Sequence, residues 1–595
     1  MPTNSTVQHI IYIHNNIANT IFRNYKLVLL LIFCFVAANT FAFIFVYQER
    51  YVYIWDWAVY WIYYQDFGAL LLQAPQEAFR SLAASVTQDY SYLPVLPLAP
   101  FSWVFGGSRL AYILAITNIF VLPAVLLIGW VVQCLDKCSN KPAGLSEFAL
   151  VTLFCLTLHP LWAPVLQGRP DIVGLVVVLI ILSIYFKNPL CEKTYGSLLF
   201  IGLLLSLIFL LRRWYAYWAI AFFPAAMLAD LFRPQKAGSN FLVNVLLTLR
   251  NTALIGITSG VVLWIIAQPL IIRALTTDYA DAFSAYKMSA TFLDGLGRTV
   301  DYFGAPLLTA CGLGLIILTL RKETRFVGAF FLMHSAIIFG LFFRVQDFHP
   351  HHFYLFFGML AITIGIFLTW IYTRLKFFLV RSLAVASIFL FSISASLVFF
   401  FPAAHAIVKP WMFTVLPGRL PENKHFPLVR YDMDRLRILL TDLEGIYAKE
   451  PGEIYVVASS LIINDDVLRN LCREVQPPIL PCSSILVSNH VDKRDGFPRQ
   501  ILAAKYVVLA APAQYHMRPE DQRVIGFLAR DFEAGRGISG AFHRLSNSYQ
   551  LEHDVSISIF HRIHPIPEQA LQELAEEFRR SYPDHSKLFT ITPAL

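Results

Sequence analysis

The sequence predicts a polytopic α-helical membrane protein with about 11 transmembrane helices and a C-terminal extracytoplasmic α/β domain. Of its 595 residues, 57% are hydrophobic and 14% are charged, and the mean hydropathy is +0.58. A soluble globular chain carries about 25% charged residues, so a cytosolic enzyme is excluded. Long uncharged stretches fill residues 27–401, whereas the remainder is polar. The net charge of +8 includes no basic run of five or more residues, and nucleic acid is excluded as a partner.

About eleven uncharged runs approach the roughly 20 helical residues that cross a bilayer core. The first run is longer than a secretory signal, so we expect a retained anchor, with a cleaved signal near Ala37 and Ala38 as the alternative. The runs within 172–229 are the shortest, and a re-entrant segment stays open there. The expected helices lie at residues 27–47, 110–133, 148–166, 172–186, 197–211, 214–229, 252–272, 303–320, 326–343, 353–373 and 377–401.

The distribution of Lys and Arg predicts the orientation. If residues 1–26 are cytoplasmic, the loops on that side hold many more cations than acids, whereas the opposite loops hold the two in nearly equal number. This asymmetry follows the positive-inside rule. An odd number of spans then puts the chain after residue 401 outside the cytoplasm, as a tail long enough for its own core.

This tail divides into a proline-rich linker, residues 402–430, and an α/β domain, residues 431–595. Prolines 402, 410, 417, 421 and 427 favour a semi-rigid connection. Among the eight cysteines, only Cys472 and Cys482 fall in the domain, and a disulfide or two buried thiols are equally open. β-Branched runs and helical spacing predict strands at 453–459, 505–511 and 555–561 and helices at 431–447 and 519–534.

The first outer loop, residues 48–108, places an acid in an aromatic belt. Asp56 stands between Trp55 and Trp57. Partial desolvation there is expected to raise the pKa of the carboxyl and to make it a proton acceptor. The alternative is that the aromatic residues anchor the interface and that Asp56 caps a helix. The apolar segment 70–86 is expected to lie along the outer interface.

Three further outer segments carry ionisable residues at span ends, where such groups are costly unless a site uses them. Paired arginines offer a bidentate donor fork to a lipid phosphate, and the alternative for each arginine is contact with lipid headgroups. The segments are Arg169-Pro170-Asp171 before the fourth span, Arg212-Arg213 between the fifth and sixth, and Arg344 to His352 before the tenth.

The last of these segments contains residue types that ligate metals, namely Asp347, His349, His351 and His352. Pro350 splits the tract, so the ligands would have to fold back to converge. We therefore favour histidines that hydrogen-bond a phosphate or a sugar over a metal site, with a structural role as the third alternative.

Taken in order along the chain, these motifs resemble the GT-C superfamily of integral membrane glycosyltransferases. Within it the similarity is to polyprenyl-phosphate-sugar-dependent enzymes: bacterial mannosyltransferases, aminoarabinose transferases and protein O-mannosyltransferases. The resemblance covers residues 20–400, but the first loop lacks the Asp-Glu or Asp-x-Asp pair of several branches. The motifs are Asp56-x-x-x-Tyr60, Tyr90-Ser-Tyr92-Leu-Pro94-Val-Leu-Pro97-Leu-Ala-Pro100, Gly168-Arg-Pro-Asp171, the arginines near 212 and Gln346-x-Phe-x-x-His-His-x-Tyr354.

The resemblance implies a GT-C-like catalytic domain over residues 27–401. Such an enzyme transfers a sugar, with inversion, from a polyprenyl-phosphate donor to a hydroxyl of an envelope glycan, a lipid or a protein, at the outer face of a bacterial inner membrane, where the spans and membrane lipids hold the prenyl chain. Asp56 is the expected general base. No metal ligand is predicted, and a divalent cation, Mg2+ or Mn2+, stays open as a cofactor. The remaining site residues are Arg212, Arg213, Arg344, His351 and His352 for the donor phosphate, and Tyr60, Asp66 and Asp171 for the acceptor or the sugar.

Other classes of membrane protein would show a different distribution of ionisable residues and loops along the sequence. A secondary transporter holds ionisable residues at mid-membrane and commonly has repeated halves, whereas the predicted spans hold few such residues, for example His159 and His334. An O-antigen ligase or a membrane acyltransferase would also use outer Arg and His residues, but ligases place their large loop late in the chain. A non-catalytic scaffold is the remaining alternative.

Overall fold

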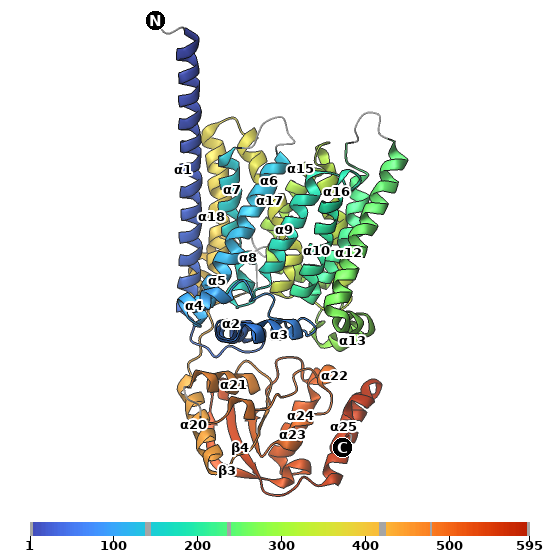
Figure 1. Cartoon of the computed structure of the whole chain (residues 1–595). Coiled ribbons are helices and arrows are strands. Elements are labelled where there is room, and N and C mark those ends of the chain that lie inside the picture. The colour runs from blue at the N-terminus through green and yellow to red at the C-terminus, as the bar shows by residue number, and fades with distance from the viewer. Residues whose placement is uncertain (1–3, 137–143, 235–239, 416–423, 476–478, 592–595) are drawn as a thin grey trace.

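The structure is a computed structural model that describes residues 4–136, 144–234, 240–415, 424–475 and 479–591. Figure 1 shows three layers along one axis: a bundle of long helices, a layer of short helices across one end of it, and an α/β domain beyond that layer. The N-terminal helix runs along one edge of the bundle and extends past its far end (Figure 1).

The long helices coincide with the predicted spans, each of which falls on one helix or on a bent pair. A π-helical turn joins α5 to α6, so these two form one continuous rod. The bundle consists of α1 (Asn4–Tyr47), α5 (Arg109–Ile116), α6 (Leu122–Asp136), α7 (Leu145–Leu156), α8 (His159–Leu166), α9 (Ile172–Lys187), α10 (Tyr195–Leu211), α11 (Ala216–Asp230), α12 (Phe241–Thr276), α14 (Phe292–Phe303), α15 (Ala305–Leu320), α16 (Arg325–Phe343), α17 (Tyr354–Arg374) and α18 (Phe378–Phe400).

In the described residues, six helices are long and apolar enough to cross a membrane, or eight if each of two bent pairs is one span. The bent pairs are α7 with α8, at 48°, and α14 with α15, at 99°. Helices α9 and α10 are apolar but shorter, and α11 contains Pro224. The chain has the helices of an integral membrane protein, while the count of eleven spans stays a prediction. The six are Tyr25–Tyr47, Arg109–Asp136, Phe241–Thr276, Arg325–Phe343, Pro350–Arg374 and Phe378–Phe400.

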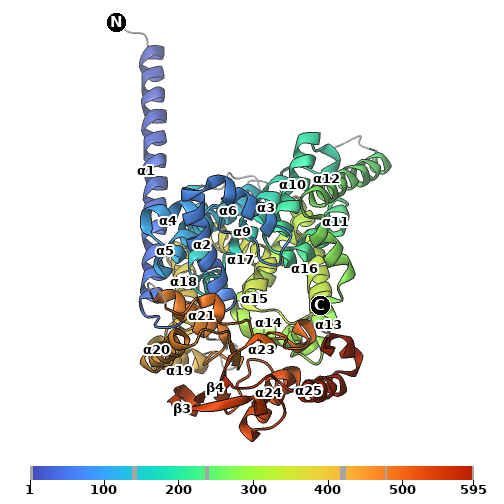
Figure 2. The same ribbon diagram turned by 60° about the horizontal axis from the view of Figure 1, so that its bottom comes forward.

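The layer across the end of the bundle comes mainly from the predicted first outer loop. Figure 2 brings this end forward and shows the short helices over the ends of the long ones. Close packing here uses Gly68, since a Cβ at this position would lie 2.2 Å from Ser102 Oγ. Residues 70–86, the segment expected along the interface, are mostly helical, since they cover the end of α2 and all of α3. The layer contains α2 (Asp56–Gln73), α3 (Pro75–Ser85), α4 (Ala99–Phe105) and α13 (Tyr279–Ala282).

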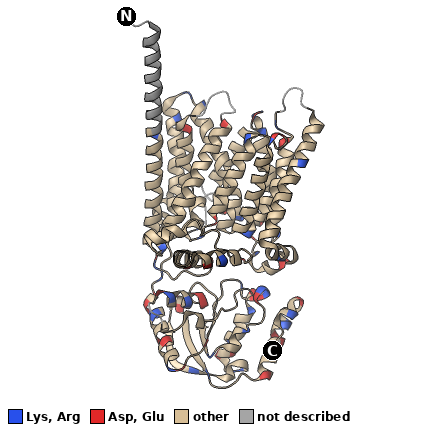
Figure 3. Cartoon of the chain, viewed as in Figure 1, with Lys and Arg blue, Asp and Glu red and all other residues tan. Residues whose placement is uncertain are grey.

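Charged residues are sorted along the same axis. Figure 3 shows them at the two ends of the bundle and over the C-terminal domain, with few along the length of the bundle. This distribution agrees with the cost of placing a charge in hydrocarbon.

The C-terminal domain is a sheet covered by helices on both faces. In the order β1-β2-β4-β3, β1 is parallel to β2 and the other neighbours are antiparallel. The strands are β1 (Ile454–Val457), β2 (Tyr506–Ala511), β3 (Phe542–Gln550) and β4 (Ser556–Arg562), and the helices are α20 (Met433–Lys449), α21 (Asp465–Glu474), α22 (Asp492–Asp495), α23 (Gln500–Ala503), α24 (Arg523–Ala534) and α25 (Glu568–Ser581).

Alternation along the strands explains this two-sided burial. Val456 and Val508 belong to the buried cluster that contains residues of α20 and α21. Tyr455 and Val507 belong to the cluster that contains residues of α24 and α25. Successive side chains of a strand point to opposite faces, so each face of the sheet receives its own layer of helices.

The predicted strands lie on β1, β2 and β4, but β3 is not predicted. Along β3 only Phe542 and Tyr549 are buried. An edge strand that is mostly exposed lacks the apolar alternation by which strands are recognised. Helices α21 and α25 are likewise absent from the prediction.

The predicted linker, residues 402–430, is partly helical. Pro402–Val415 forms α19, with Pro410 inside it. A proline at the first position of a helix lacks only an N–H that would have no partner in the helix, so Pro402 begins the helix instead of preventing it. Prolines 417 and 421 lie outside the described residues.

Cys472 and Cys482 form a disulfide, with their Cα atoms 5.7 Å apart. The sequence leaves open a disulfide or two buried thiols, and the structure has the disulfide. The bond ties Cys472 in α21 to the 3-10 turn Cys482–Ser484.

Candidate active site

Polar side chains from five segments of the chain meet at the end of the bundle that faces the C-terminal domain. The segments are the start of α2, the loop after α3, the turn between α8 and α9, the end of α10 and the turn before α17. We call these residues the Asp56 cluster: Asp56, Tyr60, Tyr90, Arg169, Asp171, Arg212, His351 and His352.

The turn between α8 and α9 depends on a glycine. Gly168 has a φ of +82°, and a Cβ at this position would lie 2.2 Å from Arg109 Nη1. Its carbonyl oxygen accepts a hydrogen bond from the Tyr112 hydroxyl at 2.9 Å. Gly168 thus ends α8 tightly and places Arg169 and Asp171 in the cluster.

Asp56 is the more accessible of the two carboxylates in the cluster, since its side chain is 22% exposed and that of Asp171 is fully buried. The Tyr90 hydroxyl donates a hydrogen bond to Asp56 Oδ1. Asp56 Oδ2 lies 4.0 Å from Arg169 Nη2 and 3.9 Å from Arg212 Nη2. One carboxylate oxygen is thus engaged by a hydroxyl, while the other faces two cations.

These neighbours determine the ionisation of Asp56. Burial on its own raises the pKa of the carboxyl, but the charges of Arg169 and Arg212 and the hydrogen bond from Tyr90 together hold the pKa below its ordinary value. The prediction of a raised pKa is therefore wrong, because nothing in the local sequence indicates that two distant arginines approach. The carboxylate is ionised at neutral pH.

Arg212 joins the two carboxylates of the cluster. Its Nε lies 2.6 Å from Asp171 Oδ1, and its Nη1 donates to the Tyr60 hydroxyl. In the described part of the chain no aligned hydrogen-bond donor reaches either carboxylate oxygen of Asp171. The charge of Asp171 is therefore balanced by the ion pair with Arg212.

The two histidines of the cluster pack against each other and are both held through Nδ1. Their rings have centroids 3.9 Å apart, beside Trp214. Arg169 donates to His351 Nδ1, and the backbone N–H of His349 donates to His352 Nδ1 at 3.1 Å. A guanidinium and an amide N–H can only donate, so both Nδ1 atoms accept, and each neutral ring is assigned its proton on Nε2. The pair thus offers two Nε2–H donors.

Three predicted site residues lie apart from the cluster. Arg213 is 2.9 Å from Asp89 and donates to the Tyr279 hydroxyl at 3.1 Å. Asp66 and Arg344 are exposed, and no ion pair or hydrogen bond between described residues joins either to the cluster. Of the residues predicted from sequence, Asp56, Tyr60, Asp171, Arg212, His351 and His352 are brought together.

Two members of the cluster receive no role from the sequence. Arg169 stands two residues before Asp171 in the same turn, and Tyr90 opens the aromatic-proline motif of the first loop. For Arg169 the signal in the sequence is its place beside Asp171, and for Tyr90 it is its place in that motif.

The cluster does not fit a divalent cation held between its carboxylates. The Arg212 guanidinium stands between Asp56 and Asp171, where such an ion would have to bind both. Among the residues that the structure describes, no three His, Cys, Asp or Glu are grouped to hold a metal ion. The cationic groups of this site are arginines.

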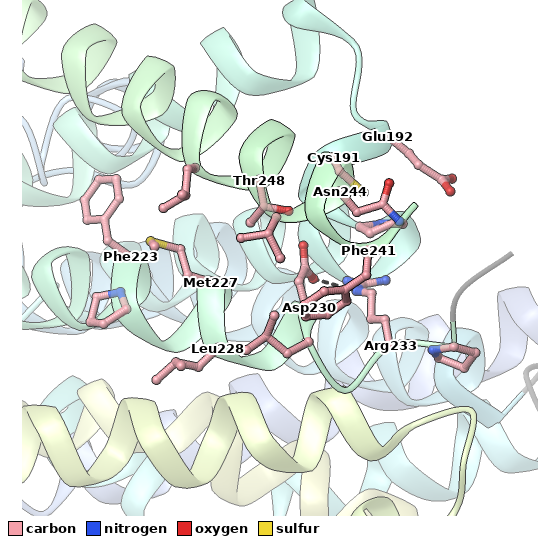
Figure 4. Close-up of a pocket in the computed structure, with 16 residues that line it drawn as sticks. Cys191, Glu192, Phe223, Met227, Leu228, Asp230, Arg233, Phe241, Asn244 and Thr248 are labelled. Atoms are coloured by element: carbon pink, nitrogen blue, oxygen red, sulfur yellow. Dashed lines mark hydrogen bonds and ion pairs between the residues drawn. The ribbon is translucent and has the colours of Figure 1, made fainter. Parts of the chain in front are cut away.

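A cavity of about 420 Å³ lies at the other end of the bundle, between α11 and α12. Figure 4 shows Phe223, Met227 and Leu228 lining it, with Arg233 paired to Asp230 beside it. The cavity is separate from the Asp56 cluster, since α11 begins near Arg212 and ends at Asp230.

No protein-family model and no curated protein sequence matches the chain. Among solved structures, it is similar to the archaeal oligosaccharyltransferase AglB from Archaeoglobus fulgidus in complex with an inhibitory peptide and a dolichol-phosphate. The identity is 14%, the TM-score is 0.41, and the match covers 82% of this chain and 69% of that chain. It is also similar to the Archaeoglobus fulgidus oligosaccharyltransferase in complex with Zn and sulfate, at 13% identity and a TM-score of 0.38, over 80% and 67% of the two chains. Both neighbours are described as oligosaccharyltransferases.

Proposed function

We propose that this chain is a membrane glycosyltransferase that transfers a sugar from a polyprenyl-phosphate-linked donor to a hydroxyl acceptor, with Asp56 as the general base. The observation that supports this proposal is the composition of the Asp56 cluster: an ionised carboxylate, two arginines beside it and two imidazole N–H donors. Displacement of a phosphate by a hydroxyl needs a proton acceptor and a stabilised anion in one place.

The proposed step is a displacement at the anomeric carbon. The acceptor oxygen bonds to this carbon while the bond from the carbon to the phosphate oxygen breaks, and the configuration inverts. The proton of the acceptor hydroxyl passes to Asp56 Oδ2, because Oδ1 already accepts from Tyr90. The leaving group keeps the electron pair of the broken bond and departs as a polyprenyl phosphate monoester.

The leaving phosphate gains negative charge, which fixed donors stabilise better than mobile water does. In the proposal, Arg169 and the Nε2–H groups of His351 and His352 bind the phosphate directly. Arg212 is held by Asp171 and adds positive charge behind them. Arg213 and Arg344 lie off the cluster and take no part in this step.

The proposed location is a bacterial inner membrane with the Asp56 cluster on the extracytoplasmic side. The positive-inside distribution of Lys and Arg supports this orientation. The disulfide between Cys472 and Cys482 supports an oxidising compartment for the C-terminal domain. The acceptor class is then a hydroxyl of an envelope glycan, a lipid or a protein.

A donor panel tests the proposal. The purified chain in lipid nanodiscs is incubated with polyprenyl-phosphate mannose, glucose, galactose and aminoarabinose, together with envelope extract from cells that lack the gene. Mass spectrometry then follows the release of polyprenyl phosphate and the mass of the products. We expect the wild type to consume at least one donor and to glycosylate one extract component. A folded wild type that consumes no donor would reject the proposed function.

A further inference from the structure

The chain that leads into α2 is packed inside the C-terminal domain. Val52 and Ile54 are buried in the same apolar cluster as residues of α20, α21 and one face of the sheet. The backbone N–H of Arg50 donates to the carbonyl of Leu428, and the N–H of Arg430 donates to the carbonyl of Arg50, both at 2.8 Å. This stretch is therefore part of the C-terminal domain in space, although it lies in the first loop of the membrane part.

Trp55, the residue before Asp56, is held in a backbone conformation that side chains rarely adopt. Its φ is 47° and its ψ is −134°. Such a conformation persists only where the surroundings over-determine it. The Asp466 carboxylate accepts the N–H of Trp55 at 3.0 Å, and Asn470 Nδ2 donates to the carbonyl of Tyr53 at 2.8 Å. Helix α21 thus holds the backbone on both sides of Ile54.

The indole of Trp55 is fixed by the same domain. Its ring centroid lies 4.6 Å from that of His516 and 5.6 Å from that of His490. Ser459 Oγ lies 2.7 Å from His516 Nδ1 and 2.8 Å from His490 Nδ1, and Asp465 lies 2.9 Å from His490 Nε2. Because these polar partners orient both imidazoles, the surface against which Trp55 packs is preorganised.

A second contact joins the domain to the layer of short helices. Lys493 of α22 lies 3.6 Å from Asp281 of α13, and its Nζ donates to Ser284 Oγ at 3.1 Å. His585 lies 3.2 Å from the other oxygen of Asp281. With contacts at residues 50–55 and at 281–284, the domain bridges two separate loops of the membrane part.

We propose that Asp466 is a positioning residue for Asp56, so that the C-terminal domain helps to set the geometry of the catalytic centre. Arg169 and Arg212 are carried by the bundle, whereas the backbone on which Asp56 begins its helix is held by α21. The separations of 4.0 and 3.9 Å between Asp56 Oδ2 and these arginines therefore depend on the hydrogen bond that the Trp55 N–H donates to Asp466. This inference rests on the proposed role of Asp56 as the base.

The test compares Asp466→Ala with Asp466→Asn, since an Asn carbonyl can accept the same N–H. The matched control is Asp434→Ala, whose side chain is 94% exposed in the same domain. Turnover is measured in nanodiscs with polyprenyl-phosphate mannose, or with the panel donor that the wild type consumes. We expect Asp466→Ala to lower kcat by about 10- to 100-fold, because small misplacements of a reacting group cost this much, with the KM for donor nearly unchanged. Asp466→Asn should restore most of kcat, and Asp434→Ala should match the wild type.

Two results would overturn the inference: a wild-type kcat in Asp466→Ala, or an equal loss in folded Asp466→Ala and Asp466→Asn. If Asp466→Ala does not fold, Asn470→Ala removes the other tether, and it must lower kcat with an unchanged donor KM. A loss of turnover in Asp56→Asn without a loss in the α21 variants rejects this inference alone. A wild type inactive with every donor rejects the proposed function instead.

Discussion

Arg212 Nε lies 2.6 Å from Oδ1 of Asp171, whose side chain is fully buried. The same guanidinium faces Asp56 through Nη2. Arg212 therefore neutralises a buried carboxylate and also contributes positive charge beside the proposed base. Its neighbour Arg213 faces the partly exposed Asp89 instead.

The two adjacent arginines are expected to differ sharply in stability. Arg212→Ala should lower the free energy of unfolding by about 3–5 kcal/mol, because it leaves the Asp171 charge buried without a partner. Arg213→Ala should cost no more than about 1 kcal/mol, because a partly exposed ion pair contributes little. Thermal unfolding of both variants in the same detergent measures the difference. Equal shifts in the midpoint would contradict the structural role of Arg212.

The ionisation of Asp56 predicts a pH profile. Its lowered pKa keeps the base ionised through the neutral range, so turnover should fall only as the pH drops below the ordinary carboxyl pKa of about 4. Arg169→Gln removes one of the charges that lower this pKa, so the pKa should rise and the loss of turnover should begin at higher pH. The pH at which kcat is half-maximal reports the pKa of Asp56, whereas the maximal kcat reports any other loss of rate in Arg169→Gln. An unchanged midpoint in Arg169→Gln would show that Arg169 does not control Asp56.

The disulfide gives a prediction that needs no substrate. Mass spectrometry of protein digested without reductant should find the peptides of Cys472 and Cys482 joined. Replacing both residues by Ser should lower the free energy of unfolding by about 3 kcal/mol, the chain-entropy value for a short loop. Reaction of both thiols with maleimide in unreduced protein would contradict the pairing and the oxidising compartment.

The sequence identifies the helices of the bundle well, because an uncharged run near the length of a bilayer core is a strong signal. It does not determine how many helices cross the membrane. The bend of 48° between α7 and α8 lies just before Pro160, and the bend of 99° between α14 and α15 lies at Gly304, just before Pro306. An apolar run interrupted in this way does not show whether the two helices form one span. In the C-terminal domain, the strands recognised from sequence are those whose residues are largely buried, whereas the exposed edge strand β3 has no apolar pattern to recognise.

The candidate site is predictable in its residue types but not in its pairings. Arg212 and Arg213 are equivalent in sequence, and only the fold shows that one faces Asp171 and the other Asp89. The pKa of Asp56 has the opposite direction from the prediction, because the approach of Arg169 and Arg212 is a tertiary relationship. The hydrogen bond between Asp466 of α21 and Trp55 joins residues more than four hundred positions apart, and no local sequence pattern indicates it.

The most direct test of the central claim is the turnover of Asp56→Asn in nanodiscs, with the donor that the wild type consumes. The matched control is Glu77→Gln, which makes the same acid-to-amide change at an exposed position of α3, away from the Asp56 cluster. A general base contributes about 100- to 10,000-fold to a rate, so kcat of Asp56→Asn should fall by at least about 100-fold while Glu77→Gln matches the wild type. Turnover of folded Asp56→Asn at the wild-type rate would contradict the assignment of Asp56 as the base.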